Sequence, residues 1–244
     1  MVIKQAEHYL NKDKRLELAK EFTRGAAENI IKNLQYYERM KGELESEVNQ
    51  IKSLLEEIEK QKTVSSLMAI EGNIRDIYYQ SFNKILPDKF RFDKRTKQPP
   101  ENMVNSLISF GNSLVYSTVL TEIYNTQLNP TISYLHEPSE RRFSLALDIA
   151  EIFKPLLSDR VIFKLINKKI IDESCFVKEL NACLLNEKGK RLFLTAYEEK
   201  LKTTIKHREL KRNVSFQRLI RLECYKLIKH LIGMKKYKPF VIWW

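Results

Sequence analysis

A glutamate occupies a position where an apolar side chain is expected, and it is the first sign of a site that could do chemistry. Glu71 falls between Leu67 and Ile74 on the apolar face of an expected helix, where a carboxylate is unfavourable unless a positive charge compensates it. Arg75, four residues further on, is spaced to form a salt bridge along the helix. A metal ion or a distant cation could compensate the Glu71 carboxylate instead. From this helix alone, a structural salt bridge with Arg75 and a functional role for Glu71 are equally well supported.

One histidine and two further carboxylates could join such a site. His136 lies in a loop before a helix and lacks the second histidine, four residues on, of the zinc-protease pattern. A lone histidine of this kind is more often a packed or surface residue than a ligand. Asp148 and Glu151 are three residues apart on one flank of the next apolar helix face. They could hold a hard divalent cation, or form an acidic helix edge near Arg141, Arg142 and Lys154.

Together, these carboxylates and the imidazole predict a Mg²⁺ or Mn²⁺ site, because mixed oxygen and nitrogen donors suit these ions better than structural zinc. The chain has a net charge of +12 over 244 residues, which favours an anionic partner such as nucleic acid or a membrane surface. Between Asn186 and Lys238, 16 Lys and Arg face 5 Asp and Glu, which is +11 of that charge. A divalent ion in a basic groove is suited to phosphodiester chemistry.

Cysteine usage and apolar runs predict the compartment. Cys175, Cys183 and Cys224 form no CxxC and no zinc spacing, as expected in a reducing cytosol. The N-terminus reaches charged residues by Lys4, unlike a signal peptide, and no apolar run is long enough to span a bilayer. We therefore expect a soluble, cytoplasmic protein without a membrane partner.

Helical spacing dominates the chain, and only 6 Gly and 7 Pro interrupt it, so the expected fold class is all-α. Helices are expected from Asn11 or Asp13, over 44–58 as a heptad-like seam, from Thr63 to about Phe82, from Glu101 to about Thr126, from Ser139 or Ser144 to near Pro155, and over 159–185, 192–210 and 215–232. Residues 87–100 are expected to form a basic loop. The expected division is an N-terminal linker and helical hairpin over 1–62 and a helical domain over 63–244, or one continuous domain over 1–244.

Several sequence blocks resemble the CRISPR-associated adaptation integrase and endonuclease family, and they occur in that family's order across the chain. The blocks are Leu67–Gly72, Pro99–Gly111, Leu135–Pro138, Ser144–Pro155, Asp159–Phe163 and the ending Lys238–Trp244. The resemblance implies a multi-helix catalytic lobe that uses a divalent metal to cleave DNA and to join spacer precursors into the repeat array by transesterification.

The resemblance also implies roles for individual residues. Glu71, His136 and Glu151 match the family's three ligands of the catalytic Mg²⁺ or Mn²⁺, and Asp148 matches a second acidic position near the metal. His136 could instead act as a proton shuttle, and the sequence does not separate the two roles. Candidate DNA-binding residues, in addition to the basic loop, are Arg160, Lys164, Arg218 and Arg221.

The implied partners are branched or double-stranded DNA and the small companion protein of the adaptation complex. Family members begin with a small β-rich domain that supports homodimers, whereas this chain begins inside the linker or first helix. We therefore expect that domain to be absent, and homodimer formation to lack its usual support.

Two other functions fit the same residues. The first is a non-catalytic basic module that binds DNA with a steep salt dependence and no metal requirement. The second is a helical scaffold that meets partner proteins through the 44–58 seam, in which case Arg75 alone compensates Glu71.

Overall fold

Polar side-chain caps begin five of the helices. In each case an Asn, Thr or Ser side chain accepts a hydrogen bond from the backbone N–H three residues further on, which satisfies a group left unpaired at a helix N-terminus. The caps and helices are Asn11 for α2 (Lys12–Lys41), Thr63 for α4 (Val64–Ile85), Asn102 for α5 (Met103–Tyr124), Asn186 for α8 (Glu187–Lys202) and Ser215 for α9 (Phe216–Leu231). The predicted starts of α2 and α4 are thus confirmed.

The computed structural model describes residues 1–91, 93–138 and 142–243. Its other helical elements are α1 (Val2–Leu10), α3 (Glu45–Glu57), η1 (Asp88–Phe90), α6 (Ser144–Phe153), η2 (Pro155–Asp159), α7 (Arg160–Asn167) and η3 (Glu173–Cys175). Helix α6 begins at Ser144, and Ser139, the alternative start, lies outside the described residues. No helix in the described ranges is long and apolar enough to cross a membrane.

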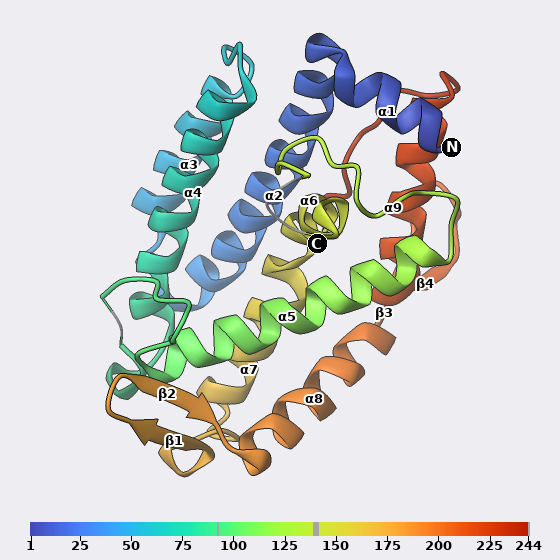
Figure 1. Ribbon diagram of the computed structural model, residues 1–244. Coiled ribbons are helices and arrows are strands. Elements are labelled where there is room, and N and C mark those ends of the chain that lie inside the picture. The colour runs from blue at the N-terminus through green and yellow to red at the C-terminus, as the bar shows by residue number, and fades with distance from the viewer. Residues whose placement is uncertain (92, 139–141, 244) are drawn as a thin grey trace.

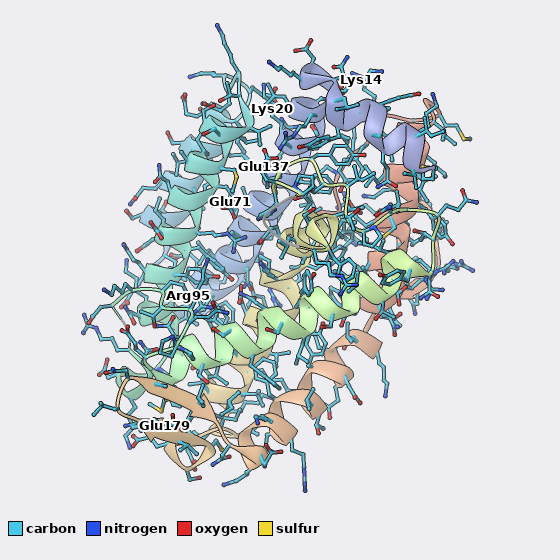
Figure 2. The ribbon with its side chains drawn as sticks, in the orientation of Figure 1. Lys14, Lys20, Glu71, Arg95, Glu137 and Glu179 are labelled. Atoms are coloured by element: carbon cyan, nitrogen blue, oxygen red, sulfur yellow. The ribbon has the colours of Figure 1, made fainter. Side chains whose placement is uncertain are left out.

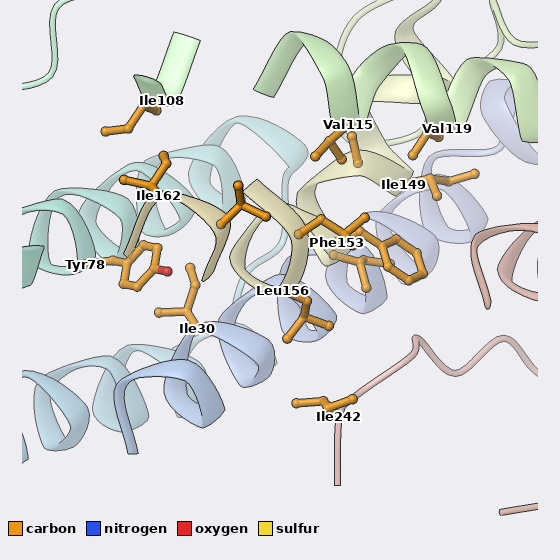
Figure 3. Packing of buried hydrophobic residues seen from close by; sticks show 14 of the residues in the cluster. Ile30, Tyr78, Ile108, Val115, Val119, Ile149, Phe153, Leu156, Ile162 and Ile242 are labelled. Atoms are coloured by element: carbon orange, nitrogen blue, oxygen red, sulfur yellow. The ribbon is translucent and has the colours of Figure 1, made fainter. Parts of the chain in front are cut away.

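Helix α6 forms the centre of the core, because all of its faces are covered. It packs against α2 on one side and α5 on the other, and its side chains Leu145, Ile149, Ile152 and Phe153 are fully buried. Figure 3 shows Ile149 and Phe153 beneath Val115 and Val119 of α5. Figure 1 shows α5 crossing in front of α6, with the α3–α4 pair to one side and α8 below. This placement sets residues of α6 between two layers of helices.

The expected seam over 44–58 packs within the molecule. Leu44, Val48, Ile51 and Ile58 are buried where α3 meets α2 and α4. Gly111 of α5 allows a close approach between elements, because a Cβ there would collide with the Ser158 side chain and with Phe193.

The prediction of an all-α fold is wrong in the C-terminal third, although the fold is mainly helical. Two antiparallel hairpins form there, β1 (Phe176–Glu179) with β2 (Ala182–Leu185), and β3 (Thr204–Lys206) with β4 (Asn213–Ser215). In such short stretches apolar residues can fit helical spacing by chance, and contacts with distant segments decide whether a helix or a strand forms. One of these contacts is a hydrogen bond from the Cys183 N–H to the Pro100 carbonyl at 2.7 Å.

Helix α6 ends at Phe153, close to Pro155 as the sequence predicted, but the chain stays helical beyond it. The chain widens into one π-helical turn, η2, in which the Asp159 N–H donates to the Lys154 carbonyl five residues back at 3.1 Å. Proline has no N–H to give to a regular turn, and the π-turn accommodates it before α7 begins. The C-terminal tail then returns to the core, where Asn29 of α2 binds the backbone of Phe240 and Ile242.

Candidate active site

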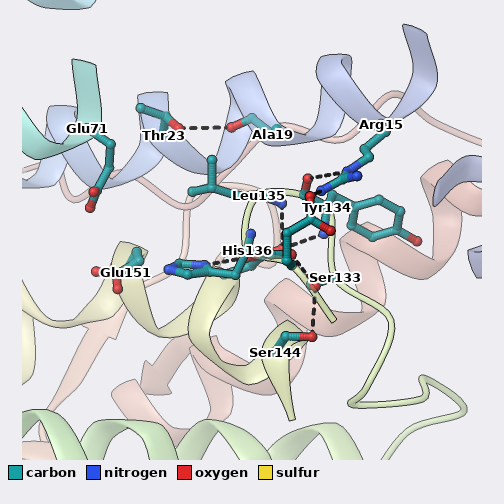
Figure 4. Close-up of polar contacts among 12 residues, drawn as sticks. Arg15, Ala19, Thr23, Glu71, Ser133, Tyr134, Leu135, His136, Ser144 and Glu151 are labelled. Atoms are coloured by element: carbon teal, nitrogen blue, oxygen red, sulfur yellow. Dashed lines mark hydrogen bonds and ion pairs between the residues drawn. The ribbon is translucent and has the colours of Figure 1, made fainter. Parts of the chain in front are cut away.

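Three separate elements bring the predicted metal-binding side chains to one place. Glu71 comes from α4, Glu151 from α6, and His136 from the loop that joins α5 to α6. Figure 4 shows both glutamates projecting into the same space, with the ring of His136 pointing toward it. Exposed side-chain fractions are 16% for Glu71, 20% for His136 and 5% for Glu151. All three side chains are therefore mostly buried, and Glu71 and His136 keep a small exposed fraction.

Asp148 organises the loop that carries His136. Its carboxylate is fully buried and accepts backbone N–H groups from Tyr134 at 2.7 Å, Leu135 at 3.1 Å and His136 at 3.0 Å. It also accepts a hydrogen bond from the His136 ring at Nδ1, at 2.8 Å. Because a carboxylate only accepts, this contact places the proton on Nδ1. The Nε2 lone pair then faces the glutamates, an arrangement typical of metal-binding histidines.

Arg15 supports the same loop from helix α2. Its Nε donates to the Tyr134 carbonyl at 3.0 Å, and its Nη2 pairs with Glu137 at 2.6 Å. Nothing in the sequence around Arg15 indicates this role, because the loop it contacts lies more than a hundred residues away. The loop is thus held on both sides, by Asp148 and by Arg15.

Arg75 bridges the two glutamates. It pairs with Glu71, as the four-residue spacing predicted, and also with Glu151 across the helix interface. Lys154 makes a further ion pair with Glu151 at 2.5 Å. One guanidinium contacting both carboxylates shows that the carboxylates lie within reach of a single cation.

The charges of this cluster shift its pKa values in opposite directions. Burial would raise the pKa of Glu71, but the adjacent Arg75, together with Lys154, holds that pKa below its ordinary value. Burial, together with the charge of Arg75, lowers the pKa of Lys154 to about 7. Both effects follow from placing several ionised groups where water is scarce.

The donor set fits Mg²⁺ or Mn²⁺ in its chemistry, with two carboxylates and one imidazole nitrogen. Among the described residues, however, no group of three His, Cys, Asp or Glu side chains is close enough together to hold an ion. Arg75 and Lys154 neutralise the glutamates instead. A metal at this site would therefore compete with these two cations for the carboxylates.

The predicted basic loop, residues 87–100, brings further basic residues near the glutamates. Arg95 donates to Asn105 Oδ1 at 3.1 Å and to Ser109 Oγ at 2.8 Å, both on α5. Burial, and then the charges of Arg75 and Arg95, lower the pKa of Lys97. Glu71 and Arg95 both lie between α4 and the middle of the molecule (Figure 2). The basic loop thus contributes positive charge beside the carboxylates.

The four tentative DNA-binding residues lie apart from this cluster and differ from one another. Arg160 donates from Nε to Asn33 at 2.9 Å, and Lys164 pairs with Glu199 at 3.1 Å. Arg221 pairs at 2.5 Å with the fully buried carboxylate of Glu122, which gives it a structural partner. Arg218 is exposed on α9. Their role in DNA binding stays a prediction.

A comparison with protein families identifies the family of this chain. The family model described as "CRISPR associated protein Cas1" matches residues 1–199. The chain therefore belongs to the Cas1 family of CRISPR-associated proteins.

Curated relatives match the whole chain, and two examples show the extent of the similarity. "CRISPR-associated protein Cas1 1" of Methanobrevibacter ruminantium is 59% identical over 244 residues, which are 73% of its length. "CRISPR-associated endonuclease Cas1" of Fusobacterium nucleatum is 52% identical over 244 residues, 72% of its length.

Solved structures show the same fold. A Cas1 protein from Thermotoga maritima matches with a TM-score of 0.87 and 44% identity, over 96% of this chain and 70% of its own. A casposase bound to its integration product matches with a TM-score of 0.87 over 98% of this chain and 70% of its own. A Cas6-RT-Cas1–Cas2 complex matches with a TM-score of 0.89 over 99% of this chain and 27% of its own. The last two are 22% and 19% identical, so they bear on the fold alone.

Proposed function

We propose that this chain is a divalent-metal-dependent DNA endonuclease and integrase of CRISPR spacer acquisition. The observation that carries the proposal is the meeting of Glu71 and Glu151 around one cation, beside the available Nε2 of His136. Membership of a family whose curated relatives include a CRISPR-associated endonuclease supports the reaction class.

In this proposal Glu71, Glu151 and His136 hold Mg²⁺ or Mn²⁺. Such an ion acts as a Lewis acid that polarises a phosphodiester and stabilises the charge developing on it. Asp148 keeps the His136 proton on Nδ1 and so keeps Nε2 available. Arg75 and Lys154, once released from the carboxylates, lie where they can neutralise a phosphate. A water molecule as nucleophile gives cleavage, and a DNA 3′-hydroxyl gives strand transfer.

The same contacts would serve His136 as a proton shuttle, because an imidazole held by a carboxylate can also transfer a proton at Nε2. Metal affinity separates the roles. If His136 is a ligand, His136→Asn should weaken Mn²⁺ binding by about 10- to 100-fold in calorimetry. Unchanged Mn²⁺ affinity with lost activity would assign it to proton transfer.

The proposed partners are double-stranded or branched DNA and the small companion protein of the adaptation complex. The net charge of +12 supports the first. The fold likeness to a casposase bound to an integration product and to a complex containing Cas2 makes both partners reasonable to test. We place this activity in the cytoplasm, which agrees with three cysteines that are all free.

A second candidate is a DNA-binding module without catalysis. The observation that favours it is that Arg75 and Lys154 already neutralise both glutamates, which leaves no charge for a metal to compensate. Such a module would bind DNA with the same affinity in EDTA and in Mn²⁺, and would release no product.

Cleavage and strand transfer of a branched DNA in Mn²⁺, Mg²⁺ or EDTA separate the two candidates. Glu71→Gln and Glu151→Gln should each lower the metal-dependent rate by at least about 100-fold, since each removes a charged ligand. Asp76→Asn is the matched control, because Asp76 lies exposed on the same helix as Glu71. DNA binding without product in any metal would refute catalysis and leave the binding module.

A further inference from the structure

A surface cavity of about 480 Å³ lies where α2, α7 and α8 meet. Its volume is within the range of small-molecule sites, about 300–1,000 Å³. None of the proposed metal-binding residues lines it. The lining residues come from these three helices and from the residues directly after α7 and α8, which are Lys168 and Thr203.

The charges around this cavity are strongly unbalanced. Four positive side chains and one negative line it, for a net charge of +3: Arg160, Lys164, Lys168, Lys200 and Glu199. A second cavity of about 370 Å³ beside the same helix α8 provides a comparison. Two positive and two negative side chains line that one, for no net charge: Lys190, Arg191, Glu187 and Glu198. Only the first of these two cavities is charged to take up an anion.

Apolar and aromatic side chains lie beside the positive charges. Tyr36 is 38% exposed and Met40 is 66% exposed, both on α2. The guanidinium of Arg160 lies over the Tyr36 ring, 4.2 Å from its centroid. Flat aromatic and guanidinium surfaces next to basic side chains are the features by which proteins bind the bases and phosphates of single-stranded nucleic acids.

Buried hydrogen bonds hold Arg160 in this position. Its Nε donates to Asn33 Oδ1 at 2.9 Å, and the Asn33 amide donates to the Tyr78 hydroxyl at 2.8 Å. The Tyr78 hydroxyl in turn donates to Asp159 at 3.0 Å. Asn33 and Tyr78 are almost completely buried, so this part of the cavity wall is formed before any ligand arrives. A preformed guanidinium loses little entropy when it binds an anion.

We propose that the cavity between α2, α7 and α8 binds a nucleoside monophosphate unit, with the base against Tyr36 and Met40 and the phosphate against Lys164 and its basic neighbours. This binding site is separate from the Glu71–His136–Glu151 cluster and needs no metal. The unit could be a free nucleotide or one nucleotide of a DNA strand. Only the second source rests on the proposed function.

The test is calorimetric titration of the full chain in EDTA with thymidine 5′-monophosphate, inorganic phosphate and a six-residue oligothymidylate. We expect one saturable site for the nucleotide and binding at least about tenfold weaker for phosphate alone, since phosphate lacks the base that stacks on the aromatic ring. An oligothymidylate that binds more tightly than the nucleotide identifies a DNA strand as the occupant. Equal or weaker binding identifies a free nucleotide.

Two substitutions test whether the nucleotide binds in this cavity, because one removes a positive charge from its lining and the other removes a negative charge. Lys164→Gln should weaken nucleotide binding by about threefold to tenfold, and Glu199→Gln should tighten it by a similar factor, because Glu199 pairs with Lys164 at 3.1 Å. Glu198→Gln, a neighbouring change that faces the uncharged cavity, should leave the affinity unchanged. Both lysine and glutamate are exposed, so folding is not at risk.

Three results would overturn the proposal: no saturable nucleotide binding, phosphate binding as tight as nucleotide binding, or the same affinity in Lys164→Gln, Glu199→Gln and Glu198→Gln. Because the titration contains no metal, loss of DNA cleavage in a separate assay would refute the proposed enzyme without affecting this result.

Discussion

Replacing Arg75 by Met should destabilise the protein in the absence of metal and make it more responsive to Mn²⁺. Arg75 contacts both Glu71 and Glu151, whose side chains are 16% and 5% exposed. Removing one partner of a buried ion pair costs about 3–5 kcal/mol. Here Lys154 remains paired with Glu151 and Glu71 is still 16% exposed, so the lower end, about 3 kcal/mol, is expected.

Urea unfolding in EDTA and in saturating Mn²⁺ measures both parts of this prediction. A metal bound at one hundred times its dissociation constant stabilises the folded state by about 2.7 kcal/mol. Mn²⁺ should therefore restore most of the stability that Arg75→Met loses. The variant should also bind Mn²⁺ more tightly than the parent, because the guanidinium no longer competes for the carboxylates.

The control is Arg39→Met, which changes an exposed arginine on α2 and should shift stability by no more than about 0.5 kcal/mol. A loss below about 1 kcal/mol for Arg75→Met in EDTA would refute the claim that Arg75 compensates buried charge. An equal loss with and without Mn²⁺ would refute competition between the guanidinium and a metal.

Three further outcomes are expected. Asp148→Asn should destabilise the fold by about 2 kcal/mol in urea unfolding. Three backbone N–H groups now donate to the Asp148 carboxylate, and the NH₂ group of an asparagine cannot accept from them. An unchanged unfolding midpoint would contradict the claim that Asp148 holds the loop. Gly111→Ala should lower the melting temperature, because its Cβ would collide with the side chains of Ser158 and Phe193; an unchanged melting curve would mean that α5 can shift freely. Burial raises the pKa of Asp159 from 3.8 to about 7, so this carboxyl group binds a proton more tightly in the folded state than in the unfolded state. The free energy of unfolding should therefore fall as pH rises from about 4 to about 7. Asp159→Asn should flatten that part of the stability–pH curve, and a parallel curve would refute the assignment.

The sequence alone determined the parts of the site that depend on neighbours along one helix. Glu71 and Arg75 are four residues apart, so helix geometry pairs them wherever the helix packs. Asp148 and Glu151 share a helix flank for the same reason, and both belong to α6 as expected. The caps Asn11 and Thr63 accept hydrogen bonds from backbone N–H groups only three residues further along the chain. Local periodicity carries all of this information.

The family resemblance predicted which distant residues form one site, and local periodicity could not predict this. It grouped His136 with Glu71 and Glu151, three residues that the sequence separates widely, and Figure 4 shows them facing one another. The family itself is confirmed, whereas the metal and the individual roles stay predictions. Basic charge by itself did not indicate that Arg221 pairs with the buried carboxylate of Glu122.

Only the tertiary structure decided which contacts form between elements. It brings Arg75 to Glu151, sets the Asp148 carboxylate under the His136 loop, and pairs Phe176 with Leu185 in a hairpin where helical spacing favoured a helix. It also assembles the basic cavity from α2, α7 and α8. Each of these depends on how distant segments pack, and packing energies are set by shape and burial across the whole core, which no local window of sequence contains.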